Sequence, residues 1–143
     1  MPFIKISPEQ VMEYWDYIKD CIAEALPPYV VENSDSLLKI QENLLIGAME
    51  CWLGIQGTET YAVAVTQLVR DEAAGTLNLL IFSLNVLYQK SQYAWKEGLE
   101  VLKIYARSKN CTNIVAYTNQ QVVKDMVRLL GGNSDWSFLK FEL

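Results

Sequence analysis

The fold of this chain is decided by residues 77–118, which read LNLLIFSLNVLYQKSQYAWKEGLEVLKIYARSKNCTNIVAYT. The segment from Thr76, just before this stretch, to Leu84 is almost continuously apolar, so we expect a strand that is covered on both faces. Apolar residues then recur at helical spacing from about Gln92 to Lys109, and a second strand is expected at Asn113 to Thr118. A helix between two buried strands indicates a parallel pair joined by a crossover.

The segments on either side complete an α+β domain. Toward the N-terminus we expect a strand, two helices and two strands, at Phe3 to Ile6, Pro8 to Leu26, Ser36 to Gly47, Glu50 to Ile55 and Thr60 to Arg70. Toward the C-terminus, Asn119 is expected to cap a helix from Gln120 to Leu130, and Trp136 to Leu143 a final strand. The order β-α-α-β-β-β-α-β-α-β predicts a single domain, residues 1–143, with a mixed central sheet flanked by helices.

Composition excludes several classes of function. The chain contains no histidine, so Ser-His-Asp and Cys-His catalysis and imidazole metal sites are excluded. Its formal charge is −5 and its basic residues are scattered, so we expect no nucleic-acid binding. No apolar run reaches the ~18 residues that a membrane span needs.

The cysteines and the N-terminus indicate a compartment. Cys21, Cys51 and Cys111 are far apart and form no CxxC pair, so we expect buried thiols rather than a disulfide or metal site. The opening MPFIKISPEQ lacks a basic region followed by an apolar stretch. We therefore expect a cytoplasmic protein.

Three short motifs match one superfamily in place and type. The opening Ile4-Lys5-Ile6-Ser7-Pro8-Glu9-Gln10 is similar to a first strand and helix start, and Tyr105-Ala106-Arg107 to the end of a third helix. Asn119, followed twelve residues later by Gly131, is similar to a fifth-strand Asn and a fourth-helix Gly. In these motifs, and in the order of its elements, the chain resembles the Gcn5-related N-acetyltransferase (GNAT) superfamily, which implies a GNAT-like α/β sandwich.

The resemblance also implies where a cofactor would bind. In GNAT proteins the fourth and fifth strands splay, and the gap holds the pantetheine arm of acetyl-CoA. The diphosphate rests on an Arg/Gln-x-x-Gly-x-Gly/Ala turn at the next helix, where backbone N–H groups and the helix dipole attract anions. Here the Arg of that turn falls on Lys90 and the small residues fall on Tyr93 and Trp95.

This turn departs from the superfamily because it lacks glycine. Two large rings stand where phosphates approach the backbone closely, which argues against cofactor binding. The candidate cofactor-binding residues are Lys90, Tyr93, Ala94, Trp95 and Asn119. Lys90 is either a phosphate ligand or, as we expect, a solvated lysine. Ala94 matters because its backbone N–H would still face a phosphate if Trp95 points into the core.

The usual catalytic groups are missing as well. The position of the superfamily's general-acid tyrosine falls on Met126 or Val127, and neither can donate a proton. The strand at Thr76 to Leu84 contains no carboxylate, which leaves Glu50 and Glu59 as candidate bases, although both are expected to be surface residues. We therefore assign no catalytic residue and no metal site.

The expected function follows from these departures. Small degenerate GNAT-like virion proteins of short-tailed phages also lack the glycine turn and end after one late strand, and the chain is similar to them in pattern. The resemblance implies a non-catalytic interaction or structural protein without a cofactor, as an internal or neck component of a virion, found in the host cytoplasm and in the particle. Its partners would be proteins, including further copies of itself. The alternative is an acyl-CoA-dependent N-acyltransferase with an atypical phosphate turn and acetyl-CoA as cofactor.

Overall fold

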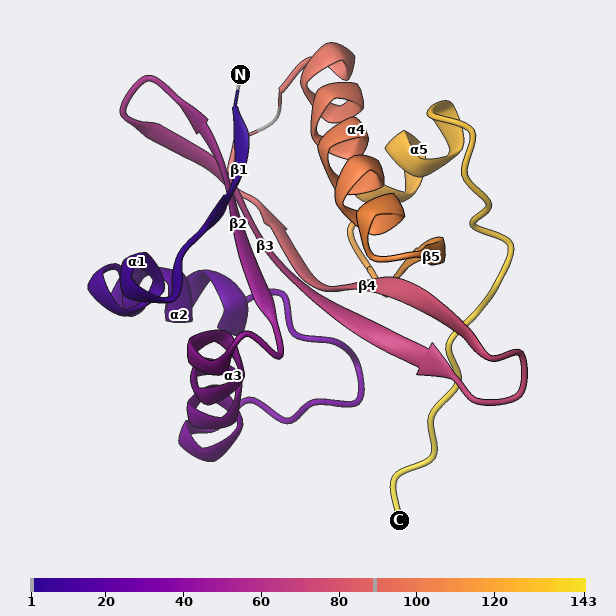
Figure 1. Cartoon of the computed structure of the whole chain (residues 1–143), viewed down its shortest axis with the longest axis horizontal. Coiled ribbons are helices and arrows are strands. Elements are labelled where there is room, and N and C mark those ends of the chain that lie inside the picture. The colour runs from indigo at the N-terminus through magenta and orange to yellow at the C-terminus, as the bar shows by residue number, and fades with distance from the viewer. Residues whose placement is uncertain (1, 89) are drawn as a thin grey trace.

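The computed structural model describes residues 2–88 and 90–143. Five strands and five helices follow one another along these residues (Figure 1). In chain order they are β1 (Phe3–Ile6), α1 (Pro8–Glu13), α2 (Trp15–Ala23), α3 (Ser34–Ile46), β2 (Glu50–Gln56), β3 (Glu59–Asp71), β4 (Thr76–Val86), α4 (Gln92–Ser108), β5 (Cys111–Ala116) and α5 (Gln121–Leu129).

The strands form one mixed sheet in the order β1-β2-β3-β4-β5. Neighbours from β1 to β4 are antiparallel, whereas β4 and β5 are parallel and joined by α4. This confirms the parallel pair with a helical crossover that the sequence of residues 77–118 predicts. It also confirms the α+β class.

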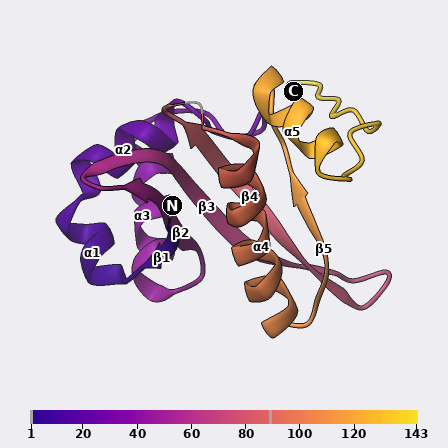
Figure 2. The ribbon, with the colours of Figure 1, turned by 90° about the horizontal axis from the view of Figure 1, so that it is seen from above.

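The sheet is covered on both faces. Figure 2 shows α1, α2 and α3 on one side and α4 and α5 on the other. On the first side Ile18 and Ile22 of α2 are fully buried against β3. On the second, Leu102 and Ala106 of α4 pack on the sheet next to Trp52. The near-continuous apolarity of β4 is therefore explained by two cores, one on each face.

The helix expected from Pro8 to Leu26 is in fact two helices. The predicted capping box is present, since Ser7 Oγ accepts from the Gln10 backbone N–H at 3.2 Å and Gln10 Oε1 accepts from the Ser7 N–H at 2.8 Å. At Tyr14 (φ −106°, ψ 18°) α1 ends and α2 begins. Val11 and Ile18 are buried in the same core on either side of this break, so the apolar pattern does not reveal it.

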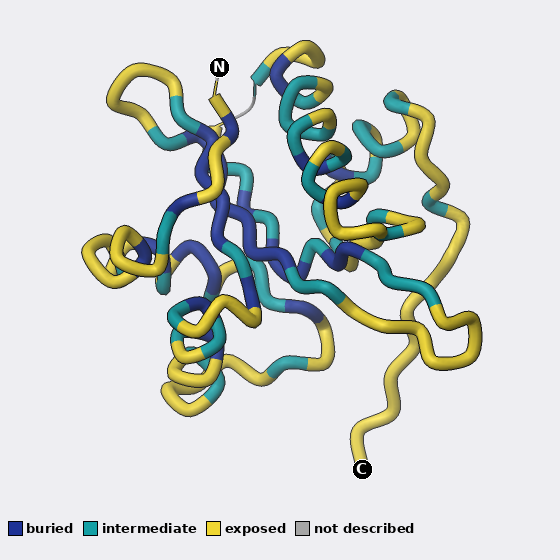
Figure 3. Tube along the Cα trace, in the orientation of Figure 1, coloured by how far each residue is buried: buried dark blue, intermediate teal, exposed yellow. Residues whose placement is uncertain are grey.

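The predicted final strand, Trp136 to Leu143, is wrong. The segment has no regular secondary structure and is largely exposed (Figure 3). Instead of pairing with β5, it packs Phe138 against Tyr29 and Tyr117, with ring centroids 6.0 and 5.2 Å apart. An alternating sequence forms a strand only where a partner strand supplies hydrogen bonds, and these contacts lead the segment away from the sheet edge.

Candidate functional site

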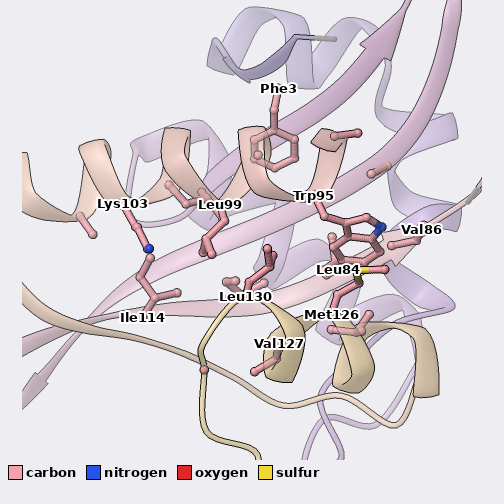
Figure 4. Close-up of a pocket in the computed structure, with 18 of the residues that line it drawn as sticks. Phe3, Leu84, Val86, Trp95, Leu99, Lys103, Ile114, Met126, Val127 and Leu130 are labelled. Carbon is pink, nitrogen blue, oxygen red and sulfur yellow. The ribbon is translucent and has the colours of Figure 1, made fainter. Parts of the chain in front are cut away.

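A cavity of about 500 Å³ lies between β4, β5, α4 and α5 (Figure 4). Its walls are mainly apolar. Leu84 and Val86 come from β4, Leu99 from α4, and Met126 and Val127 from α5. The gap that the resemblance predicted between the fourth and fifth strands is therefore open.

The cavity exists because β4 extends beyond the end of β5. The parallel pairing ends where Ile81 faces Ala116, while β4 continues to Val86. On the other edge of β4, Val65 faces Ser83 and Thr66 faces Ile81, which leaves Phe82 as an extra residue in a bulge. Beyond Ile81, the backbone groups on the β5 side of β4 have no strand beside them in the described chain, so they offer polar partners along an apolar cavity.

The N-terminus of α4 lies at one end of this cavity. Ser91 is the N-cap, and its Oγ accepts from the Ala94 backbone N–H at 3.4 Å. Ala94 is 4% exposed and lines the cavity. The N–H groups of Gln92 and Tyr93 come earlier in the helix and have no intrahelical acceptor. Two donors at the positive end of the helix dipole are thus available to an anion.

The two aromatic residues of this turn point in different directions. Tyr93 is 72% exposed and is absent from the cavity wall. Trp95 is half-buried, and its ring forms part of the wall (Figure 4). One ring, rather than the two expected from the sequence, therefore narrows this end of the cavity.

Lys90 is not the solvated lysine that the sequence suggested. Its Nζ lies 3.0 Å from Glu59 Oε1 and donates to Gln56 Oε1 at 2.9 Å, above the Tyr61 ring. Glu59, one of the two candidate bases, is therefore the ion-pair partner of Lys90. The other cations on the cavity wall are Lys103, which lies 3.5 Å from Glu100, and Arg107.

Glu50, the other candidate base, is held in a hydrogen-bond network away from the cavity. Its Oε1 accepts from the Tyr105 hydroxyl and its Oε2 from the Thr66 hydroxyl, both at 2.9 Å. Thr66 in turn accepts from Trp52 Nε1 at 2.9 Å. Burial, followed by the bond to Glu50, raises the pKa of Tyr105. This network ties α4 to β2 and β3.

Asn119 does not cap the last helix. It is exposed, and Gln120 is the N-cap of α5, with its backbone N–H donating to Thr118 Oγ1 at 3.1 Å. The Gln120 side-chain oxygen is buried without a donor among the described residues. An unpaired buried acceptor of this kind costs about 1–3 kcal/mol. Met126 and Val127 both line the cavity. Because neither side chain has a hydroxyl, the position matched to the superfamily's general-acid tyrosine offers no proton donor.

A polar contact on the opposite face of β4 was not predicted from the sequence. Asn85 is 6% exposed, and its Nδ2 donates to the Cys21 carbonyl oxygen at 3.0 Å and to Glu24 Oε2 at 3.1 Å. An amide among the apolar residues at the end of β4 was the available signal, because a buried amide needs hydrogen-bond partners. Its partners, however, are more than 60 residues away along the chain.

Charge is divided between the two halves of the molecule. Residues 1–87, which form β1–β4 and α1–α3, carry twelve acidic and four basic residues, a net charge of −8. Residues 88–143, which include α4 and α5, carry five acidic and eight basic residues, a net charge of +3. The helices on the cavity side are thus cationic, and those on the opposite side are anionic.

The described part of the chain holds free cysteines but no metal cluster. Cys21, Cys51 and Cys111 are free thiols. Across residues 2–88 and 90–143 no group of His, Cys, Asp or Glu is arranged to hold a metal ion. Within the same residues no helix has the length and apolarity to cross a membrane.

Comparison with known proteins defines the fold. No protein-family model and no curated protein sequence matches this chain. Among solved structures, it is similar to AAC(6')-Iy in complex with a bisubstrate analogue, with a TM-score of 0.73 at 12% identity over 99% of this chain and 97% of that one. It is also similar to the ribosomal-protein-alanine N-acetyltransferase of Brucella melitensis biovar Abortus 2308, with a TM-score of 0.68 at 14% identity over 100% of both chains. A GNAT family acetyltransferase of Staphylococcus aureus gives 0.66 at 13% identity over 99% and 98%. The chain has the GNAT fold, as the motifs predicted.

Proposed function

We propose that this protein binds an acyl-CoA in the cavity between β4, β5, α4 and α5 and transfers the acyl group to an amine. The observation that carries the proposal is the open cavity where β4 extends beyond the end of β5. This is the alternative interpretation of the sequence, and the structure favours it over the absence of a cofactor because the gap is not filled by Tyr93.

The cavity suits a pantetheine arm in size and polarity. About 500 Å³ lies within the usual range for small-molecule sites, roughly 300–1,000 Å³. Its apolar walls fit the methylene and methyl groups of such an arm, and the free backbone edge of β4 beyond Ile81 fits its amides. Hydrogen bonds from that edge would fix the thioester in register with the strand.

The positive net charge on the cavity side of the molecule suits an anionic acyl donor such as an acyl-CoA. Residues 88–143 carry a net charge of +3, and Lys103 and Arg107 stand on the cavity wall. The free N–H groups at the start of α4 add a partial positive charge. Among the structures with the same fold, AAC(6')-Iy has also been solved in complex with CoA.

The reaction needs little acid–base chemistry from the protein. The amine nitrogen attacks the thioester carbonyl carbon, a C–N bond forms, the C–S bond breaks, and a proton lost by nitrogen ends on the released thiol. Positioning the two reactants contributes a large part of such a rate. Met126 and Val127 supply no general acid, so we expect the proton lost by nitrogen to reach the departing sulfur through water.

Isothermal titration calorimetry with acetyl-CoA tests the proposal. We expect saturation at one site per chain. At ~100 times the dissociation constant, the ligand should raise the free energy of unfolding by about 2.7 kcal/mol, and the unfolding temperature should rise with it. Dephospho-CoA and pantetheine serve as matched ligands that carry successively fewer phosphate groups. Absence of heat and of any thermal shift at millimolar acetyl-CoA would refute the proposal.

A second candidate function is the non-catalytic interaction role, in a virion or elsewhere. The observation that favours it is the C-terminal segment, in which Trp136, Leu139, Phe141 and Leu143 are 85% exposed or more. An exposed apolar run of this size indicates a contact surface. The partner we propose is a second copy of this chain, because β5 is the last strand of the sheet and leaves one edge for an alternating segment to pair with.

Light scattering on the intact chain and on a chain that ends at residue 135 tests this second candidate. We expect the intact protein to be a dimer and the shortened one a monomer with an unchanged circular dichroism spectrum. An intact protein that is monomeric at all accessible concentrations would eliminate the second copy as the partner. Acetyl-CoA binding by either form bears only on the first candidate, so the two functions are tested separately.

A further inference from the structure

The inner faces of α4 and α5 are apolar but only partly covered. Leu99 of α4, Val127 of α5 and Leu130 at the end of α5 line the cavity, and each of these side chains is half-buried. On the opposite face of the sheet, by contrast, Ile18 and Ile22 of α2 are fully buried. Protein interiors are usually close-packed, so an apolar core that stays open between two helices has room for an apolar occupant.

This cavity is long and narrow. It runs along α4 from Ala94 in the first turn to Arg107 in the last, a distance of about 20 Å at about 1.5 Å per residue. Figure 4 shows Trp95 toward one end and Lys103 and Ile114 toward the other. A volume of about 500 Å³ spread over that length gives a mean width of about 5 Å, which is the space of one extended chain.

A pantetheine arm would fill only the part of the cavity beside the free edge of β4. From Val86 back to Ile81 this edge extends about 17 Å at about 3.3 Å per residue. The arm has about twelve bonds between its phosphate oxygen and its sulfur, which span about 15 Å at roughly 1.25 Å per bond. An arm whose phosphate end lies at the start of α4 would therefore bring its sulfur close to Ile81.

The rest of the cavity continues over the paired part of β4 and β5. This part extends from Ile81 to Leu77, about 13 Å at about 3.3 Å per residue. Ile114, whose partner in the parallel pair is Leu79, lies within this part and lines the cavity. The wall ends at Arg107, which is exposed. About ten methylene groups, at roughly 1.25 Å each, would extend from the sulfur to this polar end.

We propose that the chain groove, the part of the cavity between Ile81 and Arg107 that Ile114 lines, holds the acyl chain of the donor, which is a medium-chain acyl-CoA of roughly six to ten carbons. This inference rests on the proposed acyl transfer, and it leaves the bonds that form and break in that reaction unchanged. Each methylene that the groove buries lowers the Kd of the donor by up to about fourfold. A longer chain would pass Arg107 and reach water, so its additional methylenes would add no affinity.

Calorimetry with acetyl-CoA and octanoyl-CoA on wild type, Ile114→Trp and Val115→Trp tests the inference. Octanoyl-CoA has six additional methylenes, and because the groove covers them only in part, we expect its Kd to be at least about thirtyfold lower than that of acetyl-CoA. In Ile114→Trp the larger side chain fills the groove, so we expect this ratio to fall below about threefold. Val115 is the next residue of β5, is exposed and lies outside the cavity wall, so Val115→Trp is the matched control and should keep the ratio.

A second measurement needs no variant. Methyl NMR on isoleucine-labelled wild type should show that octanoyl-CoA shifts the Ile114 signal much further than acetyl-CoA does. Ile104 is exposed and lies outside the cavity wall, so its signal serves as the reference. Calorimetry with free octanoate tests whether the chain is recognised as part of the donor or as a separate fatty acid, and we expect octanoate to bind much more weakly than octanoyl-CoA.

Several results would overturn the inference while acetyl-CoA binding keeps the proposed function standing. They are equal affinities for the two esters, a wild-type ratio in Ile114→Trp, an Ile114 signal that responds alike to both esters, and octanoate that binds as tightly as octanoyl-CoA. If neither ester binds to wild type, the proposed function is refuted and the inference with it.

Discussion

Replacing Trp95 by alanine should weaken the fold and strengthen acyl-CoA binding at the same time. The ring is half-buried in the cavity wall near the N-terminus of α4. A buried Trp covers roughly 150–250 Å², so about 100 Å² of apolar contact is lost here, worth about 2.5 kcal/mol. Alanine returns part of this through its higher helix propensity, which leaves a net loss of about 2 kcal/mol and a Tm lower by about 8 °C.

The gain in binding comes from access to the helix terminus. With the ring removed, a diphosphate can approach the N–H groups of Gln92 and Tyr93, each capable of a charge-assisted hydrogen bond. Because this end of the helix is open to water, we expect a net gain of about 1.4 kcal/mol, a tenfold lower Kd for acetyl-CoA. Pantetheine has no diphosphate and should not share this gain.

Calorimetry with acetyl-CoA and with pantetheine on Trp95→Ala measures the effect. The matched control is Tyr93→Ala, two residues away, whose ring is 72% exposed and outside the cavity. We expect this control to change stability by less than about 0.5 kcal/mol and to leave both affinities unaltered. If Trp95→Ala is destabilised as expected but binds acetyl-CoA no more tightly than wild type, the ring does not obstruct the phosphates and the reasoning fails.

Two further predictions concern stability. Gly98 lies inside α4, and an added Cβ would meet Phe3 Cγ at 3.7 Å, an ordinary contact, so Gly98→Ala should stabilise the protein by about 0.5–1 kcal/mol. Differential scanning calorimetry should show Tm higher by roughly 2–4 °C, and an unchanged or lower Tm would mean that α4 is less regular there. Burial raises the pKa of the Cys51 thiol from 9.0 to about 12, so the folded state keeps a proton that the unfolded state releases above pH 9. The unfolding free energy should therefore fall by as much as about 4 kcal/mol between pH 9 and 12, and urea titrations of Cys51→Ala should lack this part of the fall.

Much of the fold was predictable because its signals are local. The capping box at Ser7 depends on residues three apart, and the crossover between β4 and β5 depends on a buried apolar run followed by a helical pattern. These signals do not depend on contacts with the rest of the chain. The break at Tyr14 and the missing strand at 136–143 were not predictable, since an unbroken apolar stripe and an alternating pattern are compatible with either outcome.

The candidate site was predictable only in outline. The motifs indicated a gap between the fourth and fifth strands and a helix terminus without glycine, and both are present. The direction of each ring at that terminus was not indicated, because neighbouring positions on a helix point about a quarter-turn or more apart and only the packing of α4 decides which one meets the cavity. The contact of Asn85 with Glu24 was equally hidden, since it joins positions from different elements.

Residue order alone determined the class of this protein: an acidic, histidine-free α+β domain whose parallel strand pair is linked by α4. Tertiary structure alone decided that the space beside β4 is open and that Trp95 rather than Tyr93 borders it. It also decided that the last residues leave the sheet. The physical reason is range: periodicity and capping are settled between near neighbours, whereas the width of a cavity and the partner of a buried amide depend on side chains that only the folded chain brings together.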